Sequence, residues 1–379
     1  MSIVFITLLF LIIYPYLVYP LILTLLSKTK TQRPAPKDDL LYPVSMLIAA
    51  YNEEKVIGKK IVNTLSLNYP KDKLEVIVIS DCSTDRTNEI VKSYQPQGVI
   101  LISQDRRQGK SAGINAAIPK AKGEIILCTD ANAMLDQNAL QIMVRNFCNP
   151  QIGFVTGRTK YVSSSRDRVV EVSSTYTTLE TFIKKKESEL GSCVGADGAI
   201  FAIRKNLFTP LKPTDINDLV MPLNIVKQDY RGIADDAAFC TEELSRIPDD
   251  EFQRQVRITS RTLRAIFSNS SLLNFFRFPL FSFQLISHKL LRFLSPVFLI
   301  LLLTTNILLF PSGLFYKVIL AGQCILYALA FSGIKIANRL LSIPISFIIM
   351  NYAFLKGWLH YISGKTYTTW DPSGRNPAA

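Results

Sequence analysis

Asp130 and Asn132 stand two positions apart at the end of an apolar run, Ile125-Ile126-Leu127-Cys128. Carboxylate and amide oxygens are hard ligands that suit a divalent cation bound to a phosphate. The same residue types also cap helices well, and a helical pattern follows at Gln137 to Phe147. On these residues alone, a metal site and a helix cap are equally supported.

Further acidic residues stand where other elements begin or end. Asp81 opens a polar cluster that follows the apolar run Leu74 to Ser80 and precedes a helical pattern. This order is typical of a strand, a polar loop and a capped helix. Asp218 lies near the start of an amphipathic helical pattern. Other acidic residues stand at Asp215, Asp235-Asp236 and Asp249-Asp250-Glu251. Singly, each would usually cap a helix or face solvent.

Histidine and cysteine limit the chemistry. The chain holds two histidines, His288 and His360, and none between residues 28 and 280. A Ser-His or Cys-His catalytic pair is therefore excluded there, and a general base in this region is expected to be a carboxylate. The cysteines show no paired spacing, so we expect reduced thiols and no structural zinc site. They stand at positions 82, 128, 148, 193, 240 and 324.

Two glycine-containing stretches could approach a ligand. Gly109-Lys110-Ser111 resembles the end of a phosphate-binding P-loop, but that motif requires glycine where Gln104 stands, so it is rejected. Lys110 at a helix start remains either a diphosphate contact or a solvated lysine. The stretch from Gly191 to Gly198 holds three glycines before an apolar run. It indicates close approach of the backbone to a ligand, or a tight turn.

The elements that must position these residues alternate along the chain. Apolar runs at 44–50, 74–80, 99–102 and from 125 predict strands, and the amphipathic patterns between them predict helices. Such alternation is typical of a parallel, Rossmann-like sheet. Because ligands bind outside the carboxyl ends of strands in an open sheet, Asp81 and Asp130 are expected at one ligand-binding edge.

Uncharged apolar segments flank this soluble part. Residues 1–27 and 293–316 carry no charge and are long enough to span a bilayer, which needs about 20 residues. The first lacks a basic start and a small-residue cleavage site, so we expect a retained anchor rather than a signal peptide. Shorter uncharged segments at 318–334 and 340–355 are further expected spans. The expected divisions are an anchor at 1–27, a soluble domain at 28–262, an interfacial segment at 263–290, a membrane region at 291–362 and a tail at 363–379.

The segment before the second span and the distribution of basic residues indicate how the chain lies relative to the membrane. Residues 263–290 are rich in phenylalanine with interspersed basic residues, which favours an amphipathic segment on the lipid surface over a buried helix. The net charge of +13 does not indicate nucleic-acid binding, because basic residues gather beside apolar segments. Lys28, Lys30, Arg33 and Lys37 follow the first span and place that side in the cytoplasm. Three C-terminal spans would put the tail outside, whereas Lys356, Lys365 and Arg375 favour the inside, and the sequence leaves this conflict open.

In combination and in order, these stretches resemble the membrane-bound family 2 glycosyltransferases of GT-A fold, which are similar to bacterial polysaccharide and cell-wall synthases. Residues 49–54 (AAYNEE) resemble the family's first nucleotide-binding strand and turn. Residues 80–85 (SDCSTD) are similar to its D-D-x-S-x-D element, and residues 129–132 (TDAN) to its metal-binding D-x-D. Residues 195–199 (GADGA) resemble the acceptor loop, and Ile216-Asn217-Asp218 falls at the T-E-D position, whose aspartate is the catalytic base.

The resemblance implies a Rossmann-like mixed sheet in a cytoplasmic domain of a multi-pass protein of the plasma (inner) membrane. It implies inverting transfer from a nucleotide-diphosphate sugar, first of all a UDP-sugar, to a saccharide or lipid-linked acceptor, with Mg²⁺ or Mn²⁺ as cofactor and membrane lipids around the spans. Asp218 would be the base, favoured over Asp235 and Asp236. The implied donor contacts are Tyr51, Glu53, Asp81, Lys110 and Asp130. The implied metal ligands are Asp130 and Asn132, and the implied acceptor contacts are Gly195, Ala196, Asp197 and Gly198.

Three departures from the family pattern matter. Asn132 replaces the second aspartate of the metal motif, and Asn217 replaces the glutamate beside the base. The Q-x-x-R-W signature of processive members reads RQVRI at 254–258, which argues against processive polymer synthesis. These departures leave a non-catalytic membrane protein that binds a sugar nucleotide and regulates a synthase as the alternative. Retention of Asp81, Asp130 and Asp218 favours the enzyme.

Overall fold

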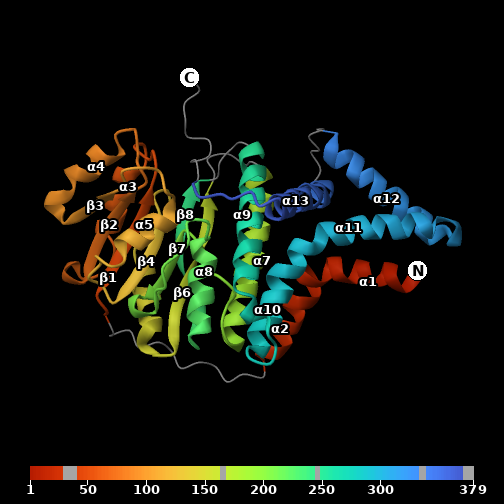
Figure 1. Ribbon diagram of the computed structural model, residues 1–379, viewed down its shortest axis with the longest axis horizontal. Helices are drawn as coiled ribbons and strands as arrows, with labels where there is room; N and C mark the ends of the chain where they lie inside the picture. The colour runs from red at the N-terminus through yellow and green to blue at the C-terminus, as the bar shows by residue number, and fades with distance from the viewer. Residues whose placement is uncertain (29–40, 163–167, 244–247, 333–338, 370–379) are drawn as a thin grey trace.

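The structure, a computed structural model, describes residues 1–28, 41–162, 168–243, 248–332 and 339–369. Its centre is a mixed sheet in the order β3-β2-β1-β4-β7-β6-β8-β5 (Figure 1). The strands are β1 Val44–Ala50, β2 Leu74–Ser80, β3 Val99–Ser103, β4 Ile125–Asp130, β5 Met134–Leu135, β6 Ile152–Val162, β7 Ile200–Arg204 and β8 Arg231–Glu243.

The first four long strands form the parallel part of the sheet. β1 pairs in parallel with both β2 and β4, and β2 pairs in parallel with β3. The register places Ala50 opposite Ser80 and Ala49 opposite Asp130, so Asp81 and Asp130 lie at the same carboxyl edge. The predicted strands and their shared edge are confirmed. The sheet as a whole is mixed, because β7 runs antiparallel to β4 and β6.

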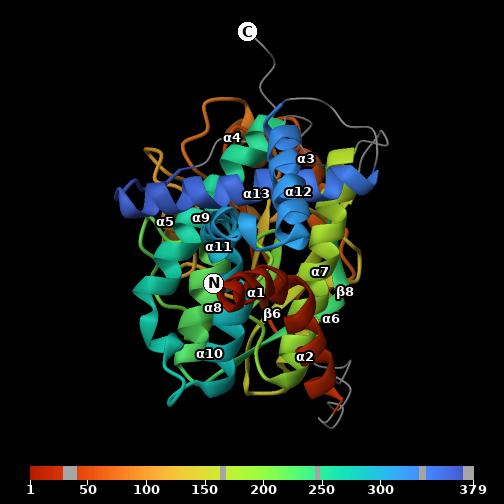
Figure 2. The same cartoon turned by 90° about the vertical axis from the view of Figure 1, so that its right-hand side faces the viewer.

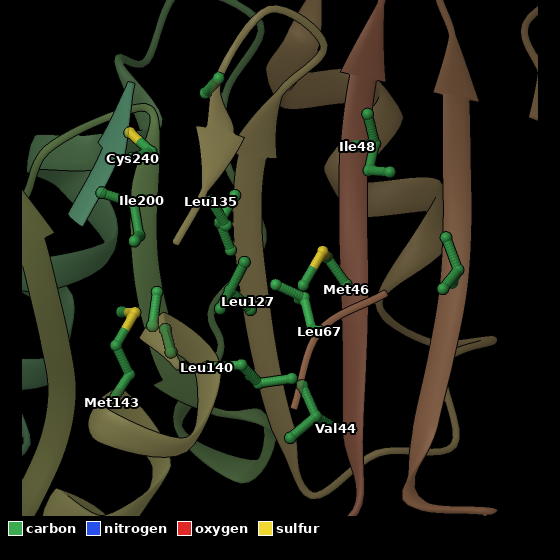
Figure 3. Close-up of a cluster of buried hydrophobic side chains, with 14 of the residues drawn as sticks. Val44, Met46, Ile48, Leu67, Leu127, Leu135, Leu140, Met143, Ile200 and Cys240 are labelled. Carbon is green, nitrogen blue, oxygen red and sulfur yellow. The ribbon is translucent and has the colours of Figure 1, made fainter. Parts of the chain in front are cut away.

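Helices cover both faces of the sheet. Alternate side chains of β1 point to opposite faces, so Met46 and Ile48 join one buried cluster and Leu47 joins the other. Figure 3 shows the first cluster, in which Met46 points toward Leu127 and Leu67 while Ile48 lies further along β1. Helices α3 Ile57–Leu65, α4 Thr87–Ser93 and α6 Ala139–Arg145 supply its outer layer. Helices α5 Lys110–Ala117 and α8 Asn217–Lys227 cover the opposite face.

Two long helices separate this α/β domain from the apolar helices. They are α7 Arg168–Leu190 and α9 Pro248–Ser268. Tyr19 and Leu23 of the N-terminal segment pack on Ile183 and Leu190 of α7. On α9, Leu263 packs with Phe293 and Phe354. Both apolar ends of the chain are therefore attached to the domain through α7 and α9.

Among the described residues, three helical segments are long and apolar enough to cross a membrane: Ser2–Ser27, Pro279–Leu308 and Leu314–Phe331. The first comprises α1 Ser2–Ile13, a π-helical turn Tyr14–Val18 and α2 Tyr19–Ser27; the second comprises α10 Pro279–Leu285, a π-helical turn Ile286–Leu290 and α11 Leu291–Leu308. The third is α12. The N-terminal segment meets these criteria as expected, and within the described residues the C-terminal third holds two candidates rather than about three. The segment Pro279–Leu308 begins inside the stretch expected to lie on the lipid surface.

Helix α13 Arg339–Ile362 accounts for the difference. It runs across α9 and across the direction of α1 and α11, as the two views together show (Figures 1 and 2). A helix in this orientation does not run alongside the candidate spans. Its proline, Pro344, and its packing on α9 distinguish it from the exposed α12.

The chain after α13 returns to the α/β domain. The guanidinium of Arg264 donates to the carbonyl of Lys365 at 3.4 Å, and Tyr367 Oη lies 2.5 Å from His360 Nδ1. The carbonyl of Thr368 lies against Gly109, where a methyl group would collide with it. The tail as far as residue 369 therefore packs against the α/β domain. Lys30, Arg33, Lys37 and Arg375 lie outside the described residues.

Candidate active site

Lys110 connects the end of β4 with the loop that precedes β7. Its Nζ lies 2.6 Å from Asp130 Oδ1 and donates to the carbonyl of Gly198 at 3.1 Å. Burial acts to lower the pKa of Lys110, but the adjacent Asp130 carboxylate outweighs it and raises that pKa. Lys110 is thus a charged contact at the start of α5, not a solvated lysine.

A buried lysine holds the turn that carries Asp130 and Asn132. The ammonium group of Lys60, from α3, donates to Thr129 Oγ1 at 3.0 Å and also to the carbonyl of Ala133. These two partners bracket residues 130–132. Lys60 has no exposed surface, and burial lowers its pKa to about 7. The turn after β4 is therefore held in place by a buried side chain of α3.

Asp218 lies beside the glycine loop. Its Oδ2 would be 2.9 Å from a Cβ at Gly198, so residue 198 must be glycine for the carboxylate to keep this place. Its Oδ1 is buried and has no hydrogen-bond partner among the described residues. Burial raises the pKa of Asp218, although Lys110 and Lys184 oppose the shift. A carboxylate with a raised pKa and a vacant acceptor is suited to take a proton.

The loop before β7 is held rigidly against the sheet. Asp197 accepts from the Thr159 N–H at 2.9 Å and from the Ala199 N–H at 3.1 Å. Gly195 has φ +77°, a conformation that suits glycine. The Ala196 N–H donates to the carbonyl of Asp218 at 2.7 Å. The structure therefore brings all the predicted acceptor residues next to Asp218, with Asp197 as the residue that anchors them.

Asp81 holds a neighbouring loop. Its carboxylate is 1 % exposed and accepts from the N–H groups of Gln108 and Gly109 at 2.8 and 3.0 Å and from Gln104 Nε2 at 3.1 Å. The glutamine that replaces the P-loop glycine thus has a structural partner. In this structure Asp81 positions the start of α5, and with it Lys110.

Tyr51 and Glu53 lie beyond the end of β1. The guanidinium of Arg107 stands over the Tyr51 ring at 3.8 Å from its centroid. The Glu53 N–H donates to Thr87 Oγ1 at 2.8 Å, and its side chain is buried. Both residues follow the carboxyl end of β1, where the Ala50 carbonyl accepts from the Asp81 N–H at 3.0 Å.

The residues that could hold a metal ion lie in the turn after β4. Asp130 and the half-buried Asn132 are separated by the buried Ala131. No group of three His, Cys, Asp or Glu residues suited to a metal occurs among the described residues. Magnesium is commonly held by one or two carboxylates together with substrate phosphates, so this donor set fits a cation that arrives with a diphosphate.

Charged residues that the sequence analysis did not single out also lie near the site. Burial, together with Asp130 and Asp197, raises the pKa of Glu242 to about 7, which places this β8 carboxylate near both halves of the site. Lys184 of α7 donates to the carbonyl of Ala196 at 3.0 Å. Lys60 could have been found, because it falls on the buried stripe of α3 formed by positions 57, 61 and 64.

The alternatives to Asp218 as the base, Asp235 and Asp236, contact other residues. Asp235 accepts from Asn146 Nδ2 at 2.9 Å, on the α6 side of the sheet. Asp236 pairs with Lys185 at 3.0 Å. Among these candidates, Asp218 is the one packed against the glycine loop.

Comparisons find known proteins that resemble this chain in sequence and in fold. Residues 45–209 match the model of the family described as "Glycosyl transferase family 2". The poly-beta-1,6-N-acetyl-D-glucosamine synthase of Staphylococcus aureus (strain COL) is 30% identical over 179 residues, which cover 46% of this chain and 42% of that protein. The Staphylococcus epidermidis protein of the same name is 29% identical over 167 residues. The chain thus matches less than half the length of these relatives.

A solved structure matches nearly the whole chain. It is a mannosyltransferase from Pyrobaculum calidifontis in complex with GDP-Man and Mn²⁺, with a TM-score of 0.75 and 21% identity. The match covers 96% of this chain and 99% of that one. At this identity the likeness establishes the fold, including the helices outside the sheet.

Proposed function

We propose that this chain, whose residues 45–209 form a family 2 glycosyltransferase domain of GT-A fold, is an inverting glycosyltransferase. It would move a sugar from a nucleotide-diphosphate sugar to a hydroxyl of a saccharide or lipid-linked acceptor at a membrane. One observation carries the proposal. Lys110 contacts both Asp130 and the carbonyl of Gly198, and Gly198 packs against Asp218, so the donor-side and acceptor-side carboxylates meet at one place.

The donor side would be formed by the carboxyl edge of the parallel strands. Asp130, with Asn132, would hold Mg²⁺ or Mn²⁺, and the bound ion would neutralise charge on the departing diphosphate. Lys110 would add a positive charge at the same place. Tyr51 and Glu53 would lie beside the nucleoside, and Asp81 would position the loop that precedes Lys110. The Mn²⁺ and GDP-Man named for the solved structure of similar fold support this use of the edge.

The acceptor side would be formed by the loop 195–198 and Asp218. Asp218 would take the proton of the acceptor hydroxyl while that oxygen attacks the anomeric carbon. The bond from that carbon to the diphosphate breaks in the same step, and the diphosphate leaves with the electron pair. One displacement inverts the configuration and needs no covalent intermediate. The raised pKa of Asp218 makes it a stronger base than an exposed aspartate.

The membrane arrangement follows from the charge pattern. Lys28 directly follows the N-terminal candidate span, and Lys356 and Lys365 lie on the side of the α/β domain. We therefore place the domain in the cytoplasm beneath the plasma membrane. The activity would contribute to a cell-surface polysaccharide or glycoconjugate, as the Staphylococcus relatives suggest by name.

The test is a donor and acceptor screen with the purified full chain in lipid nanodiscs. UDP-sugars and GDP-sugars are offered with Mg²⁺ or Mn²⁺, and products are identified by mass. We expect transfer by the wild type, and a loss of about 100-fold or more in Asp218→Asn with donor affinity unchanged.

The matched control is Asp215→Asn. Asp215 stands three residues away, and its side chain accepts from the Lys212 N–H at 2.8 Å rather than packing on Gly198. It should keep transfer near the wild-type rate. Donor binding by the wild type without transfer to any acceptor would instead favour the non-catalytic regulator.

A further inference from the structure

The two membrane segments nearest the α/β domain meet at a polar cluster. Each is interrupted by a π-helical turn, Tyr14–Val18 in one and Ile286–Leu290 in the other. Tyr14 Oη lies 3.1 Å from Ser287 Oγ across this contact. Single π-helical turns within α-helices are frequent at functional sites. Charged side chains also gather here. Burying a charge is unfavourable unless it is paired with an opposite charge.

His288 stands at the centre of the cluster. Its side chain is 1 % exposed, with Nδ1 2.8 Å from Glu187 Oε1 and Nε2 3.0 Å from Glu180 Oε2. A neutral imidazole donates from one nitrogen, whereas the doubly protonated ring donates from both. Each ring nitrogen of His288 faces one carboxylate, so the ring bridges Glu180 and Glu187.

Glu180 is held in its charged form by several cations. Burial acts to raise its pKa, but Lys289, His288 and Arg292 hold that pKa well below the ordinary value. Lys289 Nζ and Arg292 Nη1 lie 2.5 and 2.8 Å from its oxygens. Lys184, one turn along α7, lies 3.8 Å away. The start of the second membrane segment is thus bound to α7 through this carboxylate.

Glu187 and Lys184 of α7 also contact the loop beside Asp218. Glu187 Oε2 accepts from the Val194 N–H at 2.9 Å, and its Oε1 also accepts from Tyr19 Oη at 2.7 Å. Lys184 donates to the carbonyl of Ala196 at 3.0 Å. Each end of the loop 194–196 is therefore tied to a side chain that the polar cluster holds in place.

We propose that His288 is a positioning residue for the acceptor loop. Placed between Glu180 and Glu187, it fixes the α7 side chains that hold Val194 and Ala196. The membrane segment that carries His288 thereby sets the place of the loop relative to Asp218. The inference rests on the proposed function. It concerns acceptor use, because the hydrogen bonds of Asp81, which follows β2, and of Asp130, at the end of β4, do not reach this cluster.

Two substitutions of His288 separate its two bonds. An asparagine amide reaches about the place of Nδ1, and a glutamine amide reaches about the place of Nε2. His288→Asn therefore keeps a donor to Glu187, the carboxylate that holds Val194, and His288→Gln loses it. We expect His288→Gln to raise the KM for the acceptor about tenfold, and His288→Asn to raise it less than about threefold. The dissociation constant for the donor, measured by calorimetry in nanodiscs, should stay unchanged in both.

Two tyrosine variants complete the design. Tyr19→Phe removes another donor to Glu187 and should raise the acceptor KM in the same direction as His288→Gln. It also tests the inference if His288→Gln does not fold. Tyr14→Phe removes a hydroxyl from the same contact without touching either carboxylate, and should leave the acceptor KM unchanged. Donor hydrolysis, in which water replaces the acceptor, should persist in all four variants.

The outcomes separate the inference from the proposed function. Equal acceptor KM values in His288→Gln, Tyr19→Phe and the wild type overturn the inference and leave the function standing. So does a loss of donor binding in proportion to the loss of transfer, which indicates a merely structural role. A wild type that neither binds donor nor transfers sugar refutes the proposed function, and the inference with it.

Discussion

Replacing Lys60 by methionine should make the stability of the protein less dependent on pH. Burial lowers the pKa of Lys60 to about 7 in the folded chain, whereas an unfolded lysine titrates near 10.4. Between these values the unfolded chain binds more protons than the folded chain, so the free energy of unfolding rises with pH. Below about pH 7 both states hold the proton, and the destabilisation by the buried charge is complete.

The size of the effect follows from the two pKa values. Over the whole window the difference of roughly 3.5 units corresponds to about 5 kcal/mol, and between pH 7 and pH 9 to about 2 kcal/mol. For a domain of this size, 2 kcal/mol shifts Tm by about 4 to 8 °C. Lys60→Met has no group to titrate, and it also loses the hydrogen bonds to Thr129 and Ala133. The Tm of the wild type minus the Tm of the variant should therefore increase from pH 7 to pH 9, because only the wild type gains stability as pH rises.

The assay is thermal unfolding of the purified full chain in detergent at pH 7, 8 and 9. Lys59→Met is the matched control, because Lys59 is the next residue of the same helix and is more exposed than Lys60. Its Tm should follow the wild type at every pH. A wild-type gap to Lys60→Met that stays constant from pH 7 to 9 would refute the reasoning, because it would mean that the pKa of the Lys60 ammonium is not depressed in the folded state.

The remaining predictions concern the site. Gly198→Ala places a methyl group against the Asp218 carboxylate, and we expect kcat to fall about 100-fold with Tm nearly unchanged; an unaltered kcat would contradict the packing. Lys184→Gln removes a charge that lowers the pKa of Asp218 and can keep the bond to Ala196, so the acid limb of the pH–rate profile should move to higher pH. Asp130→Asn should weaken metal-dependent donor binding by about 10- to 100-fold, measured by titration with and without Mn²⁺; equal affinity would exclude Asp130 as a ligand.

The parallel part of the fold could be predicted because its signals are local. The strands β1, β2 and β4 are apolar runs that end at polar residues, and their carboxyl ends meet by topology. The amino-acid sequence alone therefore predicts that Asp81 and Asp130 share one edge of the sheet. The role of Asp81 in holding the loop at Gly109 was not predictable, because the loop conformation decides which N–H groups face the carboxylate.

The second part of the sheet was harder to predict because its pairs are distant in sequence. β8 pairs with β6 and β5, and Glu242 comes near Asp130 by this pairing rather than by any motif. The polar cluster on α7 was missed for a similar reason. Glu180 and Glu187 have the sequence appearance of a solvated helix face, and their partners stand about a hundred residues further on.

The membrane region shows the limit of hydropathy. Residues 340–355 are as uncharged as a short span, but α13 lies across α9 and its inner side packs on Phe293. Composition measures whether a helix can enter lipid, whereas orientation depends on what the helix packs against. The contact between Thr368 and Gly109 holds the end of the described chain against the α/β domain, which residue counts do not predict.

The division of the sheet at the boundary of β4 and β7 has a consequence for how such enzymes diversify. The expected donor residues follow strands on one side of this boundary, and the acceptor loop and Asp218 belong to the other. Under the proposed function, the donor side and the acceptor side can thus be altered by separate substitutions. The boundary is also the natural place to join halves of two related chains in a hybrid enzyme, provided that Lys110 and Gly198 are kept together.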